Sequence, residues 1–245
     1  MDRGYYAAFT GLLARQQAMD AVANNLANTN TTGFRAEREF FSDELTGPNA
    51  FGSQLNTAVN NYGVIGGNQI DLSQGQMMTT GNPLDLALEG QGFFAVEDLQ
   101  GNIQYTRDGS FTRSSKGVLM TRQGEPILDT KGKPITIPSG PVTIAGDGTI
   151  SVHGGVAGKI GIFTFAGGTP LVPEGVSRYQ APPKAATLTT AAVVHQGKLE
   201  GSNQNVVQGT LQLILVQRQA EMMMKALSVF SNDLDQQASQ ELPRV

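Results

Sequence analysis

Large apolar residues recur at heptad spacing near the start of the chain. They are Tyr5, Leu12, Met19 and Leu26, each seven residues after the one before, with Phe9 four residues after Tyr5. In a helix these positions share one face, and a stripe of this length is typical of helices that pack against another helix. Asn28 favours local side-chain hydrogen bonds, and Gly33 can adopt the left-handed conformation that closes a helix. The pattern therefore predicts a helix that ends between Asn28 and Gly33.

The last part of the chain carries a second heptad surface. Its members are Val206, Leu213, Ala220, Leu227 and Leu234, with Val216, Met223 and Phe230 three residues after Leu213, Ala220 and Leu227. Pro243 limits this surface, because a helix rarely continues through a proline. A helix from Asn205 to Glu241 would span roughly 50 Å at ~1.5 Å per residue, more than a compact domain requires. We expect the two terminal stripes to pair as an antiparallel, coiled-coil-like hairpin.

Between the two helices the pattern predicts an arm followed by β-structure. Residues 34–80 are predicted to form an extended arm with one or two strands, because the stretch from Thr46 to Gly81 is rich in Gly, Asn, Gln and Thr and shows weak periodicity. Leu84, Leu86 and Leu88 then alternate with other residues, as in a strand with one buried face. Isolated glycines follow every seven or eight residues from Gly101 to Gly155, which predicts short antiparallel strands joined by tight turns.

Further strands are predicted at residues 159–165 and 193–198, with the proline-rich stretch 170–183 as a loop between them. The predicted fold class is therefore α+β. It consists of an N-terminal helix in residues 1–33, an arm in residues 34–80, a mainly antiparallel β domain in residues 81–200 and a C-terminal helix in residues 201–245.

Composition and charge exclude several functions. The net charge of −4 offers no basic patch for nucleic acid. The sequence contains no run of about 18 apolar residues, so we expect no insertion into a membrane. The chain has no cysteine, which removes disulfides, thiolate nucleophiles and cysteine metal sites. A basic segment followed by an apolar one is missing at the start of the sequence, so we expect no cleaved signal peptide.

The side chains that usually carry catalysis are sparse. His153 and His195 are isolated in strand or turn contexts and lack a partner at metal-ligand spacing. The acidic residues Asp85, Asp108, Asp129 and Asp147 occupy strands or turns, where aspartate has local structural reasons to occur. Residues 90–92 lack the third glycine and the helix of a dinucleotide-binding motif. We expect no catalytic site, no cofactor and no metal site, and we interpret the protein as a non-enzyme.

Three stretches resemble the bacterial flagellar rod and hook family. They are residues 23–28 (ANNLAN) with 32–35 (TGFR), residues 83–94 (PLDLALEGQGFF) with 105–111 (YTRDGSF), and residues 199–206 (LEGSNQNV). The three occur in the family's order and bracket nearly the whole chain. Residues 35–36, 142–151 and 221–225 are closer to the proximal rod members of the family than to the distal ones.

The resemblance implies a structural subunit of the proximal rod. Such a subunit would polymerise through its terminal helices with copies of itself and with other rod proteins, and would transmit torque. It would leave the cell through the flagellar export apparatus without a cleaved signal and lie in the part of the basal-body rod that spans the periplasm.

The residues expected at the assembly interface come from the two stripes and from the signatures beside them. In the N-terminal part they are Tyr5, Phe9, Leu12, Met19, Asn24, Asn25, Leu26, Asn28, Gly33 and Phe34, and in the C-terminal part Asn203, Asn205, Val206, Leu213, Val216, Ala220, Met223, Leu227, Phe230 and Leu234. Gly33 is expected to hold a positive φ, which valine adopts only with strain and asparagine tolerates better.

A second hypothesis is a secreted glycan-binding or hydrolytic β domain flanked by oligomerising helices. Sugar sites usually need aromatic platforms, and the chain has no tryptophan and only five tyrosines. The composition therefore favours the rod subunit.

Overall fold

The chain divides into two compact units in the computed structural model, which describes residues 2–41 and 65–241. Unit 1 contains residues 1–26, 37–69 and 206–245, and unit 2 contains residues 27–36 and 70–205. Each unit therefore combines segments that are far apart in the sequence. The fold is α+β, with a helix at each end and a mainly antiparallel β middle, as predicted.

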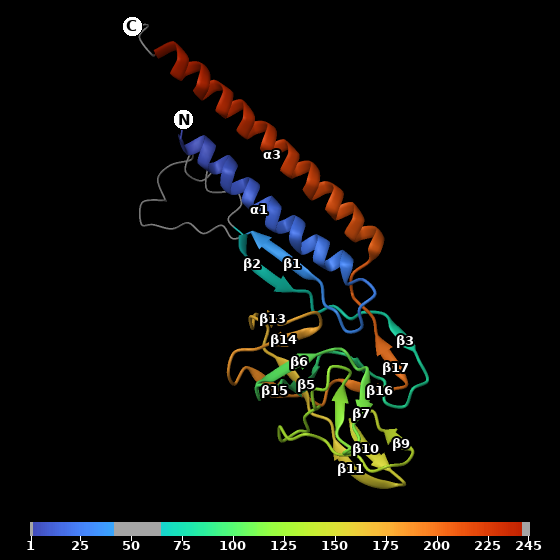
Figure 1. Cartoon of the computed structure of the whole chain (residues 1–245). Helices are drawn as coiled ribbons and strands as arrows, with labels where there is room; N and C mark the ends of the chain where they lie inside the picture. Colours follow the sequence, from blue (N-terminus) through green and yellow to red (C-terminus); the bar gives the residue numbers. More distant parts are fainter. Residues whose placement is uncertain (1, 42–64, 242–245) are drawn as a thin grey trace. The chain divides into compact units, whose positions relative to one another are not determined.

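Unit 1 is built on two long helices, α1 (Asp2–Ala27) and α3 (Val206–Glu241). The helices lie side by side and run in opposite directions (Figure 1). A Cβ placed on Gly11 would lie 3.7 Å from the sulfur of Met223, so the two helices approach to side-chain contact there. The unit also contains a two-stranded sheet of β1 (Glu37–Phe41) and β2 (Ile65–Ile70), whose last residue belongs to unit 2. Neither helix, over the described residues, has a stretch apolar and long enough to cross a bilayer.

The buried stripe of α1 consists of small side chains. Its members alternate at intervals of three and four residues and are Gly11, Ala14, Ala18, Ala21 and Asn25. Small residues at such positions let a neighbouring backbone come close, which large ones would prevent. The larger residues singled out by heptad counting lie beside this stripe: Phe9 is exposed, and Leu12, Met19 and Leu26 are half-buried.

The least exposed residues of α3 also follow heptad spacing. The stripe consists of Gly209, Leu213, Val216, Ala220, Met223 and Leu227 and matches the apolar pattern of the sequence closely, and Gln219 and Ala226 beside it are half-buried as well. The side chains of Tyr5, Phe230 and Leu234, and residues 42–64 of the expected arm, lie outside the described residues.

Unit 2 is organised around a six-stranded antiparallel sheet with the order β13-β14-β6-β5-β12-β15. Its strands are β5 (Phe93–Glu97), β6 (Ile103–Thr106), β12 (Ile162–Phe165), β13 (Val172–Pro173), β14 (Arg178–Gln180) and β15 (Ala186–Leu188). The prediction of a loop over residues 170–183 was therefore wrong, because β13 and β14 lie within it. Proline is compatible with β13 since this strand forms an edge of the sheet, where Pro173 needs no partner for a backbone N–H.

The remaining strands form four smaller antiparallel sheets with the orders β11-β10-β9, β16-β4, β17-β3 and β7-β8. They are β3 (Met77–Thr79), β4 (Leu86–Glu89), β7 (Phe111–Arg113), β8 (Leu119–Thr121), β9 (Val142–Ile144), β10 (Thr149–Val152), β11 (Gly155–Lys159), β16 (Val193–Gln196) and β17 (Lys198–Glu200). The positive-φ glycines Gly117 and Gly148 stand at turns in this region, in agreement with the glycine spacing of the sequence.

Strand β4 corrects a second expectation. The sequence predicted one buried face, but Leu86, Ala87 and Leu88 are all fully buried. Because Ala87 is small, alternation alone could not show that its side of the strand is covered as well. Leu86 and Leu88 join the main core of unit 2, in which Phe94 and Phe111 make an edge-to-face contact with ring centroids 5.1 Å apart.

Candidate functional site

Glu200, the last residue of β17, is the centre of a fully buried ion cluster in unit 2. Its Oε1 accepts a hydrogen bond from Nη2 of Arg35 at 2.7 Å and another from the backbone N–H of Gly75 at 2.9 Å. Its Oε2 accepts from Nη1 of Arg107 at 3.1 Å. One carboxylate therefore joins the segment after α1, the loop before β3 and the loop after β6.

The cluster places two cations around one anion. The pKa of Arg107 is lowered to about 10, chiefly because burial disfavours its charged form; the charge of Glu200 raises this pKa and the nearby charge of Arg35 lowers it. Arg107 thus remains protonated near neutral pH. Its guanidinium lies 5.3 Å from the centre of the Phe93 ring, close enough for a cation–π interaction. Because taking charges out of water is costly, Glu200 is needed to hold both arginines in the interior.

The backbone makes the same connection at Gly33. Its N–H donates to the carbonyl of Glu200 at 2.8 Å, and its φ of 67° confirms the positive value predicted from the sequence. A Cβ at this position would lie 2.1 Å from the backbone N of Asp108, far inside contact distance. Glycine is therefore required by close approach of another segment, in addition to its conformation.

Two asparagines of the terminal signatures fix neighbouring backbone. In unit 2, Oδ1 of Asn203 accepts from the N–H of Ala36 at 2.7 Å, and its Nδ2 donates to the carbonyl of Asp71 at 2.9 Å. In unit 1, Asn25 donates to the carbonyl of Glu37 at 2.8 Å and accepts from its N–H at 2.9 Å. Both amides imitate the pairing of a backbone strand, which accounts for them without a ligand.

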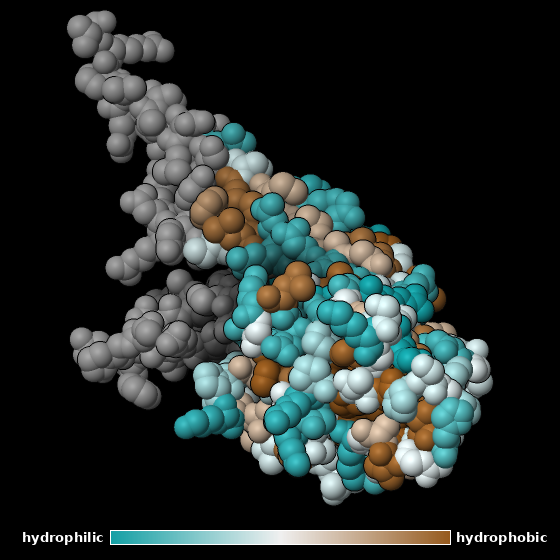
Figure 2. Space-filling view, turned by 60° about the horizontal axis from the view of Figure 1, so that its bottom comes forward, coloured by the Kyte–Doolittle hydropathy of each residue, from teal (hydrophilic) through white to brown (hydrophobic). Residues whose placement is uncertain are grey.

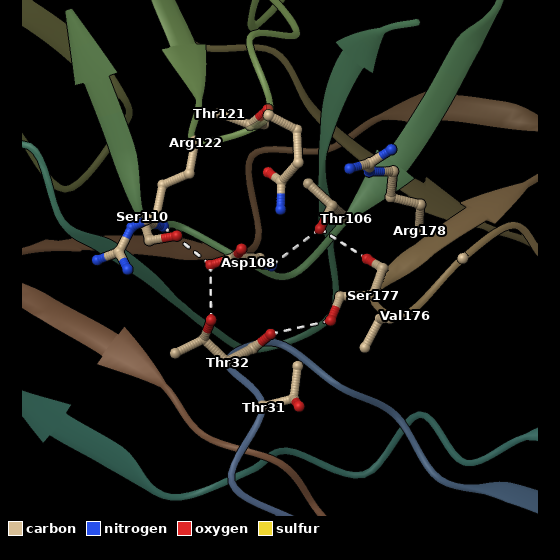
Figure 3. Close-up of a pocket in the computed structure, with 12 residues that line it drawn as sticks. Thr31, Thr32, Thr106, Asp108, Ser110, Thr121, Arg122, Val176, Ser177 and Arg178 are labelled. Carbon is tan, nitrogen blue, oxygen red and sulfur yellow. Dashed lines mark hydrogen bonds between the residues drawn. The ribbon is translucent and has the colours of Figure 1, made fainter. Parts of the chain in front are cut away.

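A polar pocket of about 450 Å³ lies next to the ion cluster in unit 2 (Figure 3). Its lining residues are Thr31, Thr32, Thr106, Asp108, Ser110, Thr121, Arg122, Gln123, Gly175, Val176, Ser177 and Arg178. The Thr32 hydroxyl donates to Asp108 at 2.9 Å, the Ser177 hydroxyl donates to the carbonyl of Thr32 at 3.0 Å, and the Thr106 hydroxyl donates to the carbonyl of Ser177 at 2.7 Å. These bonds attach the turn after α1 to two loops of the β-structure.

The pocket contains little that points to catalysis or to sugar binding. No aromatic side chain is among its lining residues, and Asp108 is its single carboxylate. Asp108 accepts hydrogen bonds from Thr32 and from the N–H of Ser110, so it serves the local backbone. Within residues 2–41 and 65–241 no three metal-binding side chains converge. The pocket therefore lies where the turn after α1 is hydrogen-bonded to two loops of the β-structure.

The structure brings together some of the residues singled out in the sequence. Gly33, Phe34 and Asn203 meet in unit 2, where Phe34 is buried, and Asn28 accepts a hydrogen bond from the Thr31 hydroxyl at 3.1 Å just after α1 ends. Asn24, Asn205 and Val206 are exposed.

Sequence reasoning missed the ion cluster itself. Arg35 and Glu200 stand inside the two terminal signatures, and Arg107 stands inside the central one. Arg35 and Glu200 are each a charge between apolar or small residues, which is the only signal that could have suggested their burial, and Arg107, between Thr106 and Asp108, lacks even that signal. The pairing between them could not be inferred, because it joins positions 165 residues apart.

Comparison with known proteins places these features in a class. Residues 6–35 match a family model described as "Flagella basal body rod protein", and residues 87–152 match one described as "Flagellar hook protein FlgE/F/G D1 domain". The first match covers α1 and the turn that leads to Arg35, and the second covers much of the core of unit 2. The N-terminal helix of the chain thus resembles that of flagellar rod proteins, and part of its β-structure resembles the D1 domain shared by flagellar hook and rod proteins.

Relatives along nearly the whole chain make the assignment more definite. The chain is 36% identical over 232 residues to the flagellar basal-body rod protein FlgF of Caulobacter vibrioides, with 93% of each chain covered. It is 32% identical to FlgF of Mesorhizobium japonicum, covering 90% of each, and 34% identical to the rod protein FlgG of Buchnera aphidicola, covering 94% of this chain and 96% of the relative. The chain belongs to the family of flagellar basal-body rod proteins, which are structural proteins.

Proposed function

We propose that this protein is a structural subunit of the proximal part of the flagellar basal-body rod, assembling through its terminal helices with copies of itself and with other rod proteins. The observation that carries the proposal is the junction at Glu200. The chain leaving α1 and the chain about to enter α3 are both bonded there, through Arg35, Gly33 and Asn203. Such a junction ties together, within unit 2, the two segments that lead out of α1 and into α3.

The burial pattern of unit 1 supports a coiled-coil-like pairing of the helices. The stripes on α1 and α3 both follow intervals of three and four residues, and Gly11 approaches Met223. Several large apolar residues remain exposed on both helices, which suits a subunit that completes its packing in a polymer. Full burial of such a side chain contributes about 1.5–3 kcal/mol, so a few contacts per subunit suffice to hold a rod that transmits torque.

The finer assignment to the proximal rod rests on the FlgF relatives. The segments 35–36, 142–151 and 221–225 favour the same assignment. The proposal includes export of the chain through the flagellar apparatus without cleavage and a place in the periplasmic part of the rod. It also includes the assignment of residues 42–64 to an arm. The glycan-binding alternative has less support, because the pocket of unit 2 has no aromatic lining residue.

The proposal is tested by isolating basal bodies from cells that lack the chain and from cells in which it is restored. We expect the chain in restored basal bodies, detected by mass spectrometry, and a rod that stops short without it. Complete rods in its absence would contradict the proposal.

A further inference from the structure

Helix α3 is apolar on two opposite sides. At 3.6 residues per turn, the side opposite the buried stripe of Leu213, Ala220 and Leu227 carries a second set of large apolar residues. This set, which we call the outer face of α3, comprises Val207, Leu211, Ile214, Leu215, Met222 and Val229, with the exposed charged residues Arg218, Glu221 and Lys225 between them. Val207 is 68% exposed and Met222 is 60% exposed. An apolar stripe of this length in water indicates a surface that binds protein.

Unit 2 offers a contrast. In the space-filling view its hydrophobic groups are dispersed among polar ones, with no comparable stripe on the face shown (Figure 2). The outer face of α3 is therefore the stronger candidate for an interaction surface.

Helix α1 has an outer face as well, on the side opposite its buried stripe of small residues. It carries Phe9, Leu13, Gln16, Asp20 and Ala23, all of which are exposed. Phe9 and Leu13 are 44% and 45% exposed. The two outer faces are both apolar in part, and the large apolar side chains Phe9, Leu13, Leu215 and Met222 on them are exposed.

The outer face of α3 carries two cations, Arg218 and Lys225, and one anion, Glu221, whereas the outer face of α1 carries the anion Asp20, so the net charges of the two faces are opposite. Asp20 of α1 is exposed and makes no ion pair with any described residue, and the same holds for Arg218 and Lys225 of α3. Opposite charges facing each other across an interface favour the correct partner and register, whereas like charges disfavour the wrong one.

The spacing of the residues fits one register between the two faces. If α1 and α3 run antiparallel with Asp20 opposite Arg218, Phe9 falls opposite Val229 and Ala23 falls opposite Leu215. The small Ala23 then leaves room for the large Leu215, as facing positions in packed helices require. Leu13 falls opposite Lys225, whose aliphatic stem can cover it while its ammonium group stays in water.

We propose that the outer face of α3 docks in this antiparallel register onto the outer face of α1 of a second copy of this chain, with Arg218 opposite Asp20. This inference rests on the proposed function and names the residues by which neighbouring copies recognise each other. Within one chain the two helices pair through their other sides, so each copy presents one α1 face and one α3 face to its neighbours.

Such a contact is heterologous, because two different surfaces meet, and it can repeat from copy to copy. The competing arrangement, in which α3 outer faces meet each other, would bring together Arg218 and Lys225 of both copies and would close after two chains. The like charges of Arg218 and Lys225 disfavour it, and Glu221, about one turn from each, offsets only part of their repulsion.

Cross-linking can detect the contact because the chain has no cysteine of its own. Ala23→Cys and Leu215→Cys would be introduced into one full-length chain that replaces the natural one in cells, and purified basal bodies would be treated with a short thiol cross-linker. We expect a ladder of dimers, trimers and longer products from the double variant and none from either single variant. The control pairs Ala23→Cys with Gln217→Cys, an exposed residue on a different side of α3, and should give no ladder.

Other products would overturn the proposal. Dimers from Leu215→Cys alone would mean that two α3 helices meet. A cross-link within one chain would mean that positions 23 and 215 of the same copy lie together, and no cross-link in basal bodies that contain the double variant would mean that something other than a second copy covers these faces.

Charge exchange gives a second test. Arg218→Asp should lower the amount of the chain in basal bodies roughly tenfold, and adding Asp20→Arg to the same chain should restore it, whereas Gln217→Asp should change little. Failure of the exchange to restore incorporation would contradict the register. Absence of the unaltered chain from basal bodies would instead refute the proposed function, so the two failures are distinguishable.

Discussion

Arg35 and Glu200, 165 residues apart in the sequence, form a fully buried ion pair with 2.7 Å between Nη2 and Oε1. Arg35 follows the first helix and Glu200 precedes the last one. The pair fixes the chain at these two points within unit 2, and the arginine of a central loop, Arg107, completes it.

Removing the charge of Glu200 should destabilise unit 2 strongly. Glu200→Gln leaves two buried guanidinium groups without a counter-charge, and we expect the free energy of unfolding to fall by about 3–5 kcal/mol. Urea denaturation followed by near-ultraviolet circular dichroism of Tyr105 and Tyr179 would measure it. Asp147→Asn, which breaks an exposed ion pair with Lys159, is the control and should leave the midpoint unchanged. Equal midpoints for the two variants would show that the buried cluster contributes no stability.

Gly33 should reject every side chain, including the asparagine that its positive φ alone would tolerate. The expectation of a mild Gly33→Asn effect is corrected by the structure, because any Cβ would collide with the backbone of Asp108. Gly81 provides a matched control, since it has a φ of 75° and no atom within 4 Å of its Cβ position. Gly81→Ala should cost about 1–2 kcal/mol, from the backbone conformation alone.

We expect Gly33→Ala to cost several kcal/mol more than Gly81→Ala, or to prevent unit 2 from folding. Thermal unfolding of both variants would measure the difference. Similar melting temperatures would mean that the approach of residues 107–108 to Gly33 is not rigid.

The fold was predictable where a repeating pattern reported burial, and not where burial depended on tertiary contacts. The heptad positions of α3, from Leu213 to Leu227, identified its buried stripe because large apolar residues mark it. On α1 the same reasoning selected Leu12 and Met19, whereas the more buried positions are small residues such as Ala14 and Ala18. Counting large side chains cannot detect a stripe defined by their absence.

The site was predictable in part for the same reason. Gly33 and Asn203 have local conformational or hydrogen-bonding signatures, so a single sequence points to them. Glu200 has no such local signature, because its role depends on Arg35 and Arg107, which only the folded chain brings near.

The small-residue stripe of α1 should tolerate little added volume. Ala18→Leu places a large side chain at a position that is 4% exposed, and we expect a loss of about 1–3 kcal/mol in unit 1. Ala23→Leu adds the same volume at an exposed position of the same helix and serves as the control. Far-ultraviolet circular dichroism during thermal unfolding would compare them. A loss of helix stability that is equal in both variants would contradict a closely packed stripe.

The central claim is that the terminal helices carry assembly while the β-structure folds independently of it. The most direct measurement is the amount of Leu213→Asp chain in basal bodies, at equal expression, with Leu188→Asp on the exposed edge of unit 2 as the control. A carboxylate on the half-buried stripe of α3 costs several kcal/mol unless it is paired. We predict that the Leu213→Asp chain keeps the near-ultraviolet spectrum of unit 2, is missing from basal bodies and leaves cells non-motile, whereas Leu188→Asp assembles. Normal amounts of the Leu213→Asp chain in basal bodies of swimming cells would contradict the account.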